Sequence, residues 1–210
     1  MVNTEVCGTF DSGSTPDGHP NMLVFKNIWD NEILIKTLKD GGVVVMPTDT
    51  IYGIVGQALN QNTVERIYQI RQRNPNKPCI ILVSSFQELE NFSVNLTIEQ
   101  ENKIKEFSDK PTSIIFDCPD DEFFYLHRGT KTLAFRLPQE EGLVNLLKIT
   151  GPLIAPSANT EGLPPSKNTK EARGYFEERV DLYIDGGEIV ANASRVIQIN
   201  NAGEVSIIRP

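Results

Sequence analysis

The stretch VVVMPTDTIYG, residues 43–53, decides how this chain folds. Residues 43–46 form a wholly apolar run, which is typical of a strand covered on both faces of a sheet. Pro47 ends this strand, and two hydroxyls flanking the carboxylate of Asp49 follow it. In open α/β sheets, the loops that leave strand ends commonly bind ligands. The stretch therefore predicts a buried strand followed by a polar loop, which is either a ligand-binding loop or an ordinary turn.

Helical and strand-like segments alternate along the rest of the chain. Apolar residues at helical spacing over residues 31–40 stop at Gly41–Gly42, where glycine commonly ends a helix. Asn62 and Thr169 are well placed to cap the starts of two later helices. Strands outnumber helices near the end of the chain, which favours a mixed sheet over a purely parallel one. We expect helices at about 62–72, 97–107, 140–149 and 169–179, and strands at 79–83, 113–116, 132–137, 153–156, 182–185, 195–199 and 204–208.

Residues 23–210 carry these elements with no linker and no internal repeat, so the sequence predicts a single α/β domain. Residues 1–22 are instead rich in Gly, Ser, Thr, Asp and Pro, which predicts a flexible N-terminal tail. The 210-residue chain is 39% hydrophobic and 23% charged, as is usual for a soluble globular protein. No apolar run approaches the roughly 20 residues that span a membrane, and no secretion signal is visible. We therefore expect a cytoplasmic protein.

The charge and the cysteine content argue against several classes of function. A net charge of −8 disfavours a surface built for broad contact with nucleic acid, which needs clustered Lys and Arg. Cys7, Cys79 and Cys118 are widely spaced and lie far in sequence from His19 and His127. A disulfide framework or a structural zinc site is therefore not expected. Cys79 opens an apolar run and is expected in the core.

A cationic segment, RQRNPNKP at residues 71–78, follows the second expected helix. Arg71, Arg73 and Lys77 gather positive charge in an otherwise acidic protein, and arginine forks make charge-assisted hydrogen bonds with phosphate oxygens. The alternative is an ordinary solvated helix end, where the helix dipole favours positive charge. The prolines at positions 75 and 78 stiffen the loop and lower the ordering cost of binding, which favours a polyphosphate site.

Ser157 and Asn159 follow the expected strand at 153–156 and precede a loop rich in Gly and Pro at 160–166. Side chains two residues apart in extended backbone point to the same side, so this hydroxyl and carboxamide can face one ligand. The alternative is that both side chains cap a turn.

Arg136 stands near the end of the otherwise apolar segment TLAFRLP, residues 132–138. A buried arginine requires an anionic partner, which can be an internal carboxylate or a bound ligand. The later DGG at 185–187, together with Ser194 and Arg209, is either a second edge of the same site or a set of hairpin turns. Neither a Walker A phosphate loop nor a Gly-x-Gly-x-x-Gly fingerprint occurs in the chain, so a bound nucleotide would use another route.

Taken together, these motifs resemble the YrdC-like family of L-threonylcarbamoyladenylate synthases in order and spacing, over about residues 28–210. The motifs are PTDTIYG, RQRNPNKP, TLAFRLP, APSANTEG and the late DGG…SRV. The resemblance implies a single domain with a twisted mixed sheet, flanked by helices around a large basic cavity. It also implies the conversion of L-threonine, bicarbonate and ATP to threonylcarbamoyl-AMP and pyrophosphate. That product feeds the formation of N6-threonylcarbamoyladenosine at position 37 of tRNA.

The resemblance also implies roles for individual residues, carried over motif by motif. It implies an L-threonine site at Thr48, Arg136, Ser157 and Ser194, and a nucleotide site at Arg71, Arg73, Lys77, Thr132, Asn159, Ser166 and Arg209. Arg71 stands where the family usually has Lys, and Arg195 follows Ser194 where the family usually has Thr. No covalent nucleophile or acid–base residue is implied, since no His lies in the motifs.

The resemblance makes ATP a substrate that brings Mg²⁺ with it, without a metal site of the protein itself and without a tightly bound cofactor. It implies hand-over of the product to a tRNA threonylcarbamoyl-transferase complex, with at most weak tRNA binding and no membrane partner. Two alternatives remain open at this point. One is a non-catalytic module that binds double-stranded RNA or tRNA, against which the charge of −8 counts. The other is an enzyme that forms a carbamoyl-adenylate from carbamoyl phosphate, a domain usually found within larger chains.

Overall fold

The computed structural model describes the backbone of residues 22–24 and all of residues 28–210. The predicted tail, residues 1–22, lies outside the described residues except for Met22, which begins the first strand. The helices are α1 (Glu32–Lys39), α2 (Gln61–Arg71), α3 (Ile98–Lys105), α4 (Phe124–His127), α5 (Glu141–Thr150) and α6 (Thr169–Phe176), with short 3₁₀ helices η1 (Phe86–Phe92), η2 (Asp121–Phe123) and η3 (Glu177–Arg179). The strands are β1 (Met22–Val24), β2 (Val44–Pro47), β3 (Tyr52–Gln57), β4 (Ile80–Leu82), β5 (Thr112–Asp117), β6 (Thr132–Arg136), β7 (Leu153–Ile154), β8 (Leu182–Asp185), β9 (Arg195–Ile199) and β10 (Val205–Arg209). Across this described part, no helix combines the length and the apolar character needed to cross a membrane.

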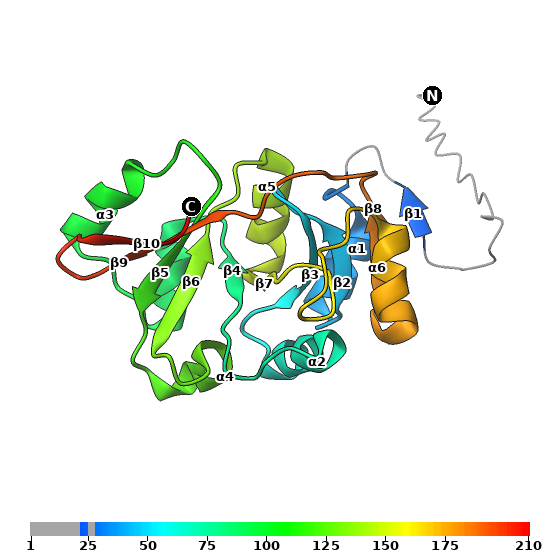
Figure 1. Ribbon diagram of the computed structural model, residues 1–210, viewed down its shortest axis with the longest axis horizontal. Helices are drawn as coiled ribbons and strands as arrows, with labels where there is room; N and C mark the ends of the chain where they lie inside the picture. Colours follow the sequence, from blue (N-terminus) through cyan, green and yellow to red (C-terminus); the bar gives the residue numbers. More distant parts are fainter. Residues whose placement is uncertain (1–21, 25–27) are drawn as a thin grey trace, which may run out of the picture.

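The strands form one sheet in the order β1-β8-β2-β3-β7-β4-β6-β5-β9-β10 (Figure 1). Neighbouring strands run parallel at β2–β8, β4–β6 and β5–β9, and antiparallel at β2–β3, β5–β6 and β9–β10. The prediction of a mixed sheet is therefore confirmed. The connection between β8 and β9 crosses much of the sheet to its other end, and the antiparallel β10 then brings the end of the chain back toward the middle of the molecule (Figure 1).

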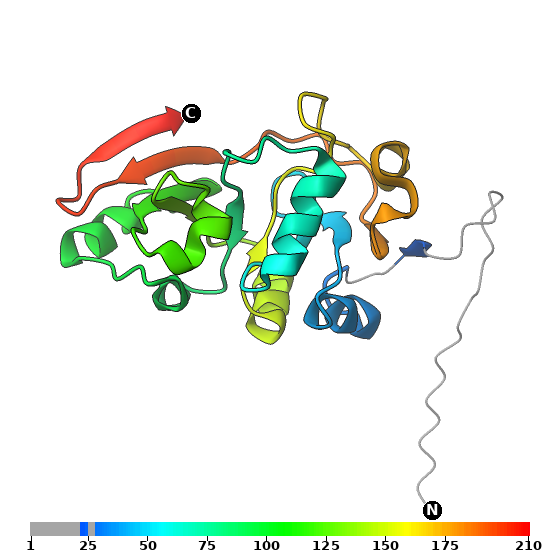
Figure 2. The same ribbon diagram turned by 90° about the horizontal axis from the view of Figure 1, so that it is seen from below.

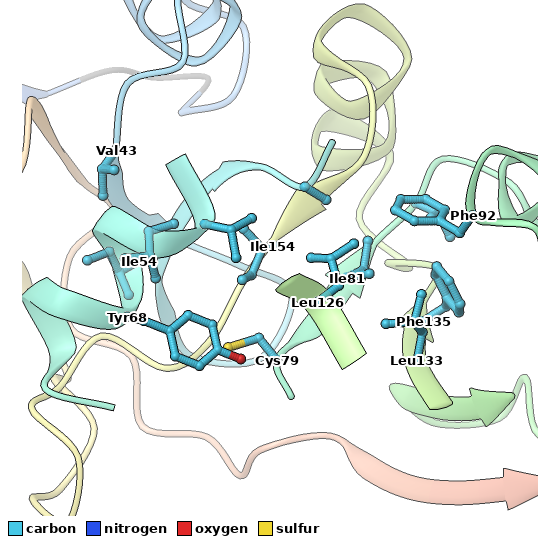
Figure 3. Close-up of a cluster of buried hydrophobic side chains, with 14 of the residues drawn as sticks. Val43, Ile54, Tyr68, Cys79, Ile81, Phe92, Leu126, Leu133, Phe135 and Ile154 are labelled. Carbon is cyan, nitrogen blue, oxygen red and sulfur yellow. The ribbon is translucent and has the colours of Figure 1, made fainter. Parts of the chain in front are cut away.

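β2 lies inside the sheet and is buried on both faces, as its apolar sequence predicts. Val43 and Val45 pack in one hydrophobic cluster with residues of α2, α4 and α6, part of which Figure 3 shows. Val44 and Met46 pack in a second cluster with residues of α1 and α5. Alternate side chains of a strand point to opposite faces, so this one run joins both layers of helices to the sheet. Figure 2 shows α1 and α5 on one side of the molecule, opposite β10 and α6.

The predicted starts of two helices are wrong by one or two residues. α2 is capped by Asn60, whose side chain accepts a hydrogen bond from the backbone N–H of Thr63, and not by Asn62. α6 is capped by Asn168, which accepts from the N–H of Glu171, whereas the expected cap Thr169 is the first helical residue. In both cases an asparagine with extended backbone reaches the third N–H of the helix, which is the geometry that a cap needs.

β3 is not among the strands expected from the sequence, and it begins inside the stretch that was expected to be a loop. β3 contains Gly53 and Gly56, and glycine is depleted in strands, so its pattern is weak. A Cβ at Gly56 would lie 2.4 Å from the Thr63 side chain, so the glycine allows α2 to pack closely on the sheet. The polar loop after β2 is thus the turn between two antiparallel strands.

Candidate functional site

A cavity of about 570 Å³ opens where the motifs meet. Its lining comes from the β2–β3 turn, the segment after α2, β6, the segment after β7, and the end of the β8–β9 connection with β10. Segments that are far apart in the sequence therefore share one concave surface. The cavity carries several cationic side chains and is large enough for a small polar molecule.

Arg71 is buried at the wall of the cavity and joins two motifs. Its Nε donates to the carbonyl of Asn159 at 3.0 Å, and its Nη2 donates to Asn159 Oδ1 at 3.1 Å and to Ser157 Oγ at 3.2 Å. Nη1 has no hydrogen-bond partner among the described residues. Burial, followed by repulsion from Arg73, lowers the pKa of Arg71 to about 10, so the side chain is a cation at neutral pH. The expected wall of Ser157 and Asn159 is therefore held directly by the expected phosphate-binding arginine.

Arg73 and Lys77 extend the cationic wall toward solvent. The Arg73 guanidinium donates to the carbonyls of Lys77 and Pro78 at 3.0 and 2.7 Å, which fixes the loop around it. Lys77 is more exposed, with 63% of its side chain accessible. The carboxylate of Glu161 lies 3.8 Å from Arg73 Nη1 and 3.5 Å from Lys77 Nζ. The cationic segment is therefore part of the cavity wall and not a free helix end.

Arg136 lies at another part of the lining, on β6. Its Nη2 lies 2.9 Å from Asp49 Oδ1, and the side chains of this pair are only 5% and 2% exposed. Nη2 also donates weakly to Thr48 Oγ1 at 3.4 Å. Burial lowers the pKa of Arg136, and the negative charge of Asp49 opposes this shift. Asp49 and Arg136 are an ion pair by distance, but neither Asp49 oxygen accepts a hydrogen bond within the described part of the chain. Arg136 Nε likewise has no hydrogen-bond partner there, so unused donors and acceptors remain beside the cavity.

A third set of polar groups comes from the end of the chain. Ser194 is buried, and its hydroxyl lies 2.8 Å from that of Ser113 on β5. Arg209 donates from Nε and Nη2 to the Ser194 carbonyl at 3.0 and 2.6 Å. Both Ser194 and Arg209 line the cavity, so the end of β10 completes its wall.

Tyr52 joins the β2–β3 turn to the DGG turn at 185–187. Its hydroxyl donates to the Gly187 carbonyl at 2.8 Å and accepts from the Gly186 N–H at 2.9 Å. We expect Tyr52→Phe to lower the free energy of unfolding by about 1–2 kcal/mol, because the Gly186 N–H loses its acceptor. Denaturant unfolding measures this loss. The matched control is Tyr125→Phe, which removes a donor to the Ala58 carbonyl and leaves no N–H group without an acceptor.

The same substitution is expected to change the alkaline limit of stability. Burial raises the pKa of Tyr52 to about 12, so the fold favours the neutral phenol. The unfolded phenol ionises near pH 10, so the stabilisation is complete below about pH 10 and is lost as the pH rises toward about 12. Tyr52→Phe should therefore flatten the fall in stability across that range. Two results together would contradict the assigned role of Tyr52. One is an equal fall in stability between about pH 10 and 12 for the parent and Tyr52→Phe, and the other is an equal loss of unfolding free energy for Tyr52→Phe and Tyr125→Phe.

The structure brings together nearly all of the residues that the sequence singled out. The exception is Ser166, which is absent from the lining and donates its hydroxyl to the Ala158 carbonyl at 2.6 Å, so it supports the Ser157–Asn159 wall from behind. Cys79 is buried as expected, packs beside Tyr68 in Figure 3, and also borders the cavity. The predicted residues in the lining are Thr48, Arg71, Arg73, Lys77, Thr132, Arg136, Ser157, Asn159, Ser194 and Arg209.

The predicted site residues did not include two carboxylates that lie at the site, Asp49 and Glu161. Asp49 is the anionic partner that a buried Arg136 requires, and this requirement could have identified it. Glu161 contacts the cationic segment from the loop after Asn159. No feature of the local sequence points to that contact, because it depends on how two distant loops meet.

Comparison with known proteins places the chain among relatives. The family model described as "Telomere recombination" and named for Sua5, YciO and YrdC matches residues 36–210. A threonylcarbamoyl-AMP synthase of Pyrococcus abyssi is 30% identical over 184 residues, which are 87% of this chain and 54% of that protein. One from Hahella chejuensis is 29% identical over 185 residues, which are 86% of this chain and 98% of that protein. The chain thus spans about half the length of the P. abyssi relative.

Solved structures agree with the family match. P. abyssi Sua5 complexed with L-threonine superposes with a TM-score of 0.73 at 30% identity, over 85% of this chain and 53% of that one. E. coli YciO superposes with a TM-score of 0.75 over 90% of this chain and 94% of that one, and at 22% identity it shows the fold alone. The α/β fold class and the family resemblance expected from the motifs are both confirmed. The chain belongs to the Sua5/YciO/YrdC family.

Proposed function

We propose that this protein is an L-threonylcarbamoyladenylate synthase, which converts L-threonine, bicarbonate and ATP to threonylcarbamoyl-AMP and pyrophosphate. The observation that carries the proposal is a single cavity with a cationic wall at Arg71, Arg73 and Lys77 and a separate buried arginine at Arg136. Such a cavity suits two anionic substrates that must meet. The family membership and the names of the relatives support the same assignment.

The threonine end of the cavity would be formed by Arg136 and Thr48. Arg136 lines the cavity and its buried Nε has no partner among the described residues, so we propose that this side chain binds the substrate carboxylate while Nη2 stays with Asp49. The Thr48 hydroxyl donates to the Ile51 carbonyl at 2.8 Å and accepts from Arg136 Nη2 at 3.4 Å, so it helps to hold the guanidinium that is proposed to bind the substrate. Ser157 and Ser194 supply further hydroxyls in the lining. The P. abyssi protein crystallised with L-threonine supports an amino-acid site in this fold.

The nucleotide end would be the wall of Arg71, Arg73, Lys77 and Asn159. We propose contacts to phosphate oxygens from Arg71, whose buried Nη1 has no partner among the described residues, and from the exposed ammonium of Lys77. Thr132 and Arg209 border the same cavity and are proposed as further contacts to the nucleotide. Ser166 acts indirectly, through its hydrogen bond to Ala158. Mg²⁺ arrives with ATP as part of the substrate.

The reaction needs positioning and charge compensation more than a chemical group from the protein. The threonine amine bonds to the carbon of bicarbonate, and water leaves to give a carbamate. A carbamate oxygen then attacks the α-phosphorus of ATP, and the bond to the β-phosphate oxygen breaks to release pyrophosphate. Arg71, Arg73 and Lys77 offset the negative charge that builds on this leaving group. Solvent takes the amine proton, and no residue of the protein is proposed as the base.

We further propose that the product serves formation of N6-threonylcarbamoyladenosine at position 37 of tRNA in the cytoplasm. An acyl-adenylate is a reactive mixed anhydride, so a transferase that binds tRNA must accept the threonylcarbamoyl group. The proposed partner is therefore a tRNA threonylcarbamoyl-transferase complex, with tRNA itself bound weakly by this acidic chain.

Pyrophosphate release from ATP tests the proposed function. We expect release only when L-threonine and bicarbonate are both present, and Lys77→Ala should raise KM for ATP about threefold to tenfold. The matched control is Lys103→Ala, which removes a surface ammonium paired with Glu106 outside the cavity and should leave KM unchanged. Pyrophosphate formed equally well without threonine would refute the assignment.

A further inference from the structure

Glu161 contributes the one carboxylate in the cavity lining of the described chain. The lining is otherwise cationic, polar or apolar, so this acid stands out in a wall suited to anions. Its side chain is only 25% exposed, and it lies on the loop that follows Asn159. The loop itself is fixed by the Glu161 N–H, which donates to the Arg71 carbonyl at 2.9 Å.

The contacts of the Glu161 carboxylate are those that a phosphate group would make. One oxygen accepts from the backbone N–H of Asn74 at 2.9 Å, and the other lies 3.5 Å from Lys77 Nζ. Arg73 Nη1 lies 3.8 Å away. A backbone N–H, an ammonium and a guanidinium around one point form a typical anion-binding set. The pKa of Glu161 is lowered: burial would raise it, but the Asn74 N–H and the two cations outweigh burial.

We propose that Glu161 is a displaceable internal anion, which occupies part of the polyphosphate site and competes with the nucleotide for Arg73 and Lys77. This inference rests on the proposed function, because it takes the cationic wall to be the polyphosphate site. When the polyphosphate enters, its oxygens replace the carboxylate at the Asn74 N–H and at the two cations. Glu161 then weakens binding of both ATP and pyrophosphate, and so favours release of the product.

Two other roles for Glu161 make opposite predictions. As a ligand of the Mg²⁺ that accompanies ATP, Glu161 would strengthen nucleotide binding only when the metal is present. As a latch that merely holds the loop in shape, it would strengthen binding with or without metal. Competition alone predicts that neutralising the carboxylate tightens the binding of a metal-free polyphosphate.

The test is calorimetric titration of Glu161→Gln with inorganic tripolyphosphate and with ATP, each without and with Mg²⁺. Gln keeps an oxygen that can accept from the Asn74 N–H, so the loop contact survives while the charge is lost. We expect both ligands to bind roughly 3- to 10-fold more tightly to this variant without metal. The matched control is Glu106→Gln, which loses the same charge at a surface pair with Lys103 and should bind as the parent does.

A double variant ties the effect to the proposed cations. In a Lys77→Met background, Glu161→Gln should tighten binding by a smaller factor, because one of the two competed cations is absent. The competition is refuted if Glu161→Gln binds the metal-free ligands no more tightly than the parent does. The proposed function still stands in that case, provided that the parent binds both ligands and that Arg73→Ala weakens this binding. If neither ligand binds to the parent or to Glu161→Gln, the proposed function and this inference both fail.

Discussion

Replacing Asp49 by Asn is expected to lower the free energy of unfolding by about 3–5 kcal/mol. The substitution leaves the Arg136 guanidinium buried without an anionic partner, and no other carboxylate of the described residues pairs with it. The cost arises because a buried, uncompensated charge loses its hydration and gains little in return. Unfolding in urea or guanidinium measures this loss of free energy, provided that the parent and Asp49→Asn show the same dependence of that free energy on denaturant concentration.

The same variant is expected to lose threonine-dependent turnover at temperatures where it remains folded. We expect Arg136 to change its orientation without Asp49, and so to lose the contact to the substrate carboxylate that is proposed for it. The matched control is Asp40→Asn, which breaks an exposed pair with Lys36 and should change stability by less than about 0.5 kcal/mol. Equal stability changes for the two Asn variants would show that the buried Arg136 does not depend on Asp49 as its anionic partner.

Replacing Arg71 by Ala is expected to lower kcat/KM for ATP by about 30- to 300-fold. The loss corresponds to about 2–3.5 kcal/mol, which combines a hydrogen bond to a charged group, worth about 1.5–3 kcal/mol, with the loss of order in the adjoining loop. Arg71 makes contacts with both Ser157 and Asn159, so its removal also frees the loop that carries these side chains. Steady-state assays of pyrophosphate release over a range of ATP concentrations measure the effect.

Arg71→Lys separates the charge of this side chain from its shape. An ammonium keeps the positive charge, but a single Nζ cannot replace Nε and Nη2 in their separate contacts. We expect an intermediate loss of about tenfold. If Arg71→Ala keeps the parent kcat/KM for ATP, the Arg71 wall takes no part in nucleotide binding.

The sequence identified the centre of the fold because one run of residues meets one strict physical requirement. Residues 43–46 are apolar on both alternating sides, and a short strand between two helical layers that ends at a proline satisfies that pattern. β3 lacks such a pattern, because its two glycines serve close packing and not hydrophobic periodicity. The helix caps were displaced because neighbouring polar residues can each cap, and tertiary context decides among them.

The sequence predicted which residues line the candidate site better than it predicted which hydrogen bonds and ion pairs they make. The burial of Arg136 implies an anion, yet its sequence does not say whether that anion is Asp49 or a ligand. Arg71 was expected to face phosphates, while its fork is largely engaged with Asn159 and Ser157. Glu161 contacts Lys77, which lies 84 residues earlier in the chain. This contact depends on how two loops meet in the fold, so no local sequence pattern predicts it.

The proposed synthase activity can be followed through the fate of isotopically labelled bicarbonate, incubated with the protein, MgATP and L-threonine. We expect the proposed activity to give a product that contains AMP, threonine and the labelled carbon together, identified by mass, and formed only when all three substrates are present. Label that never enters such a product, while ATP is split at the same rate without threonine, would contradict it.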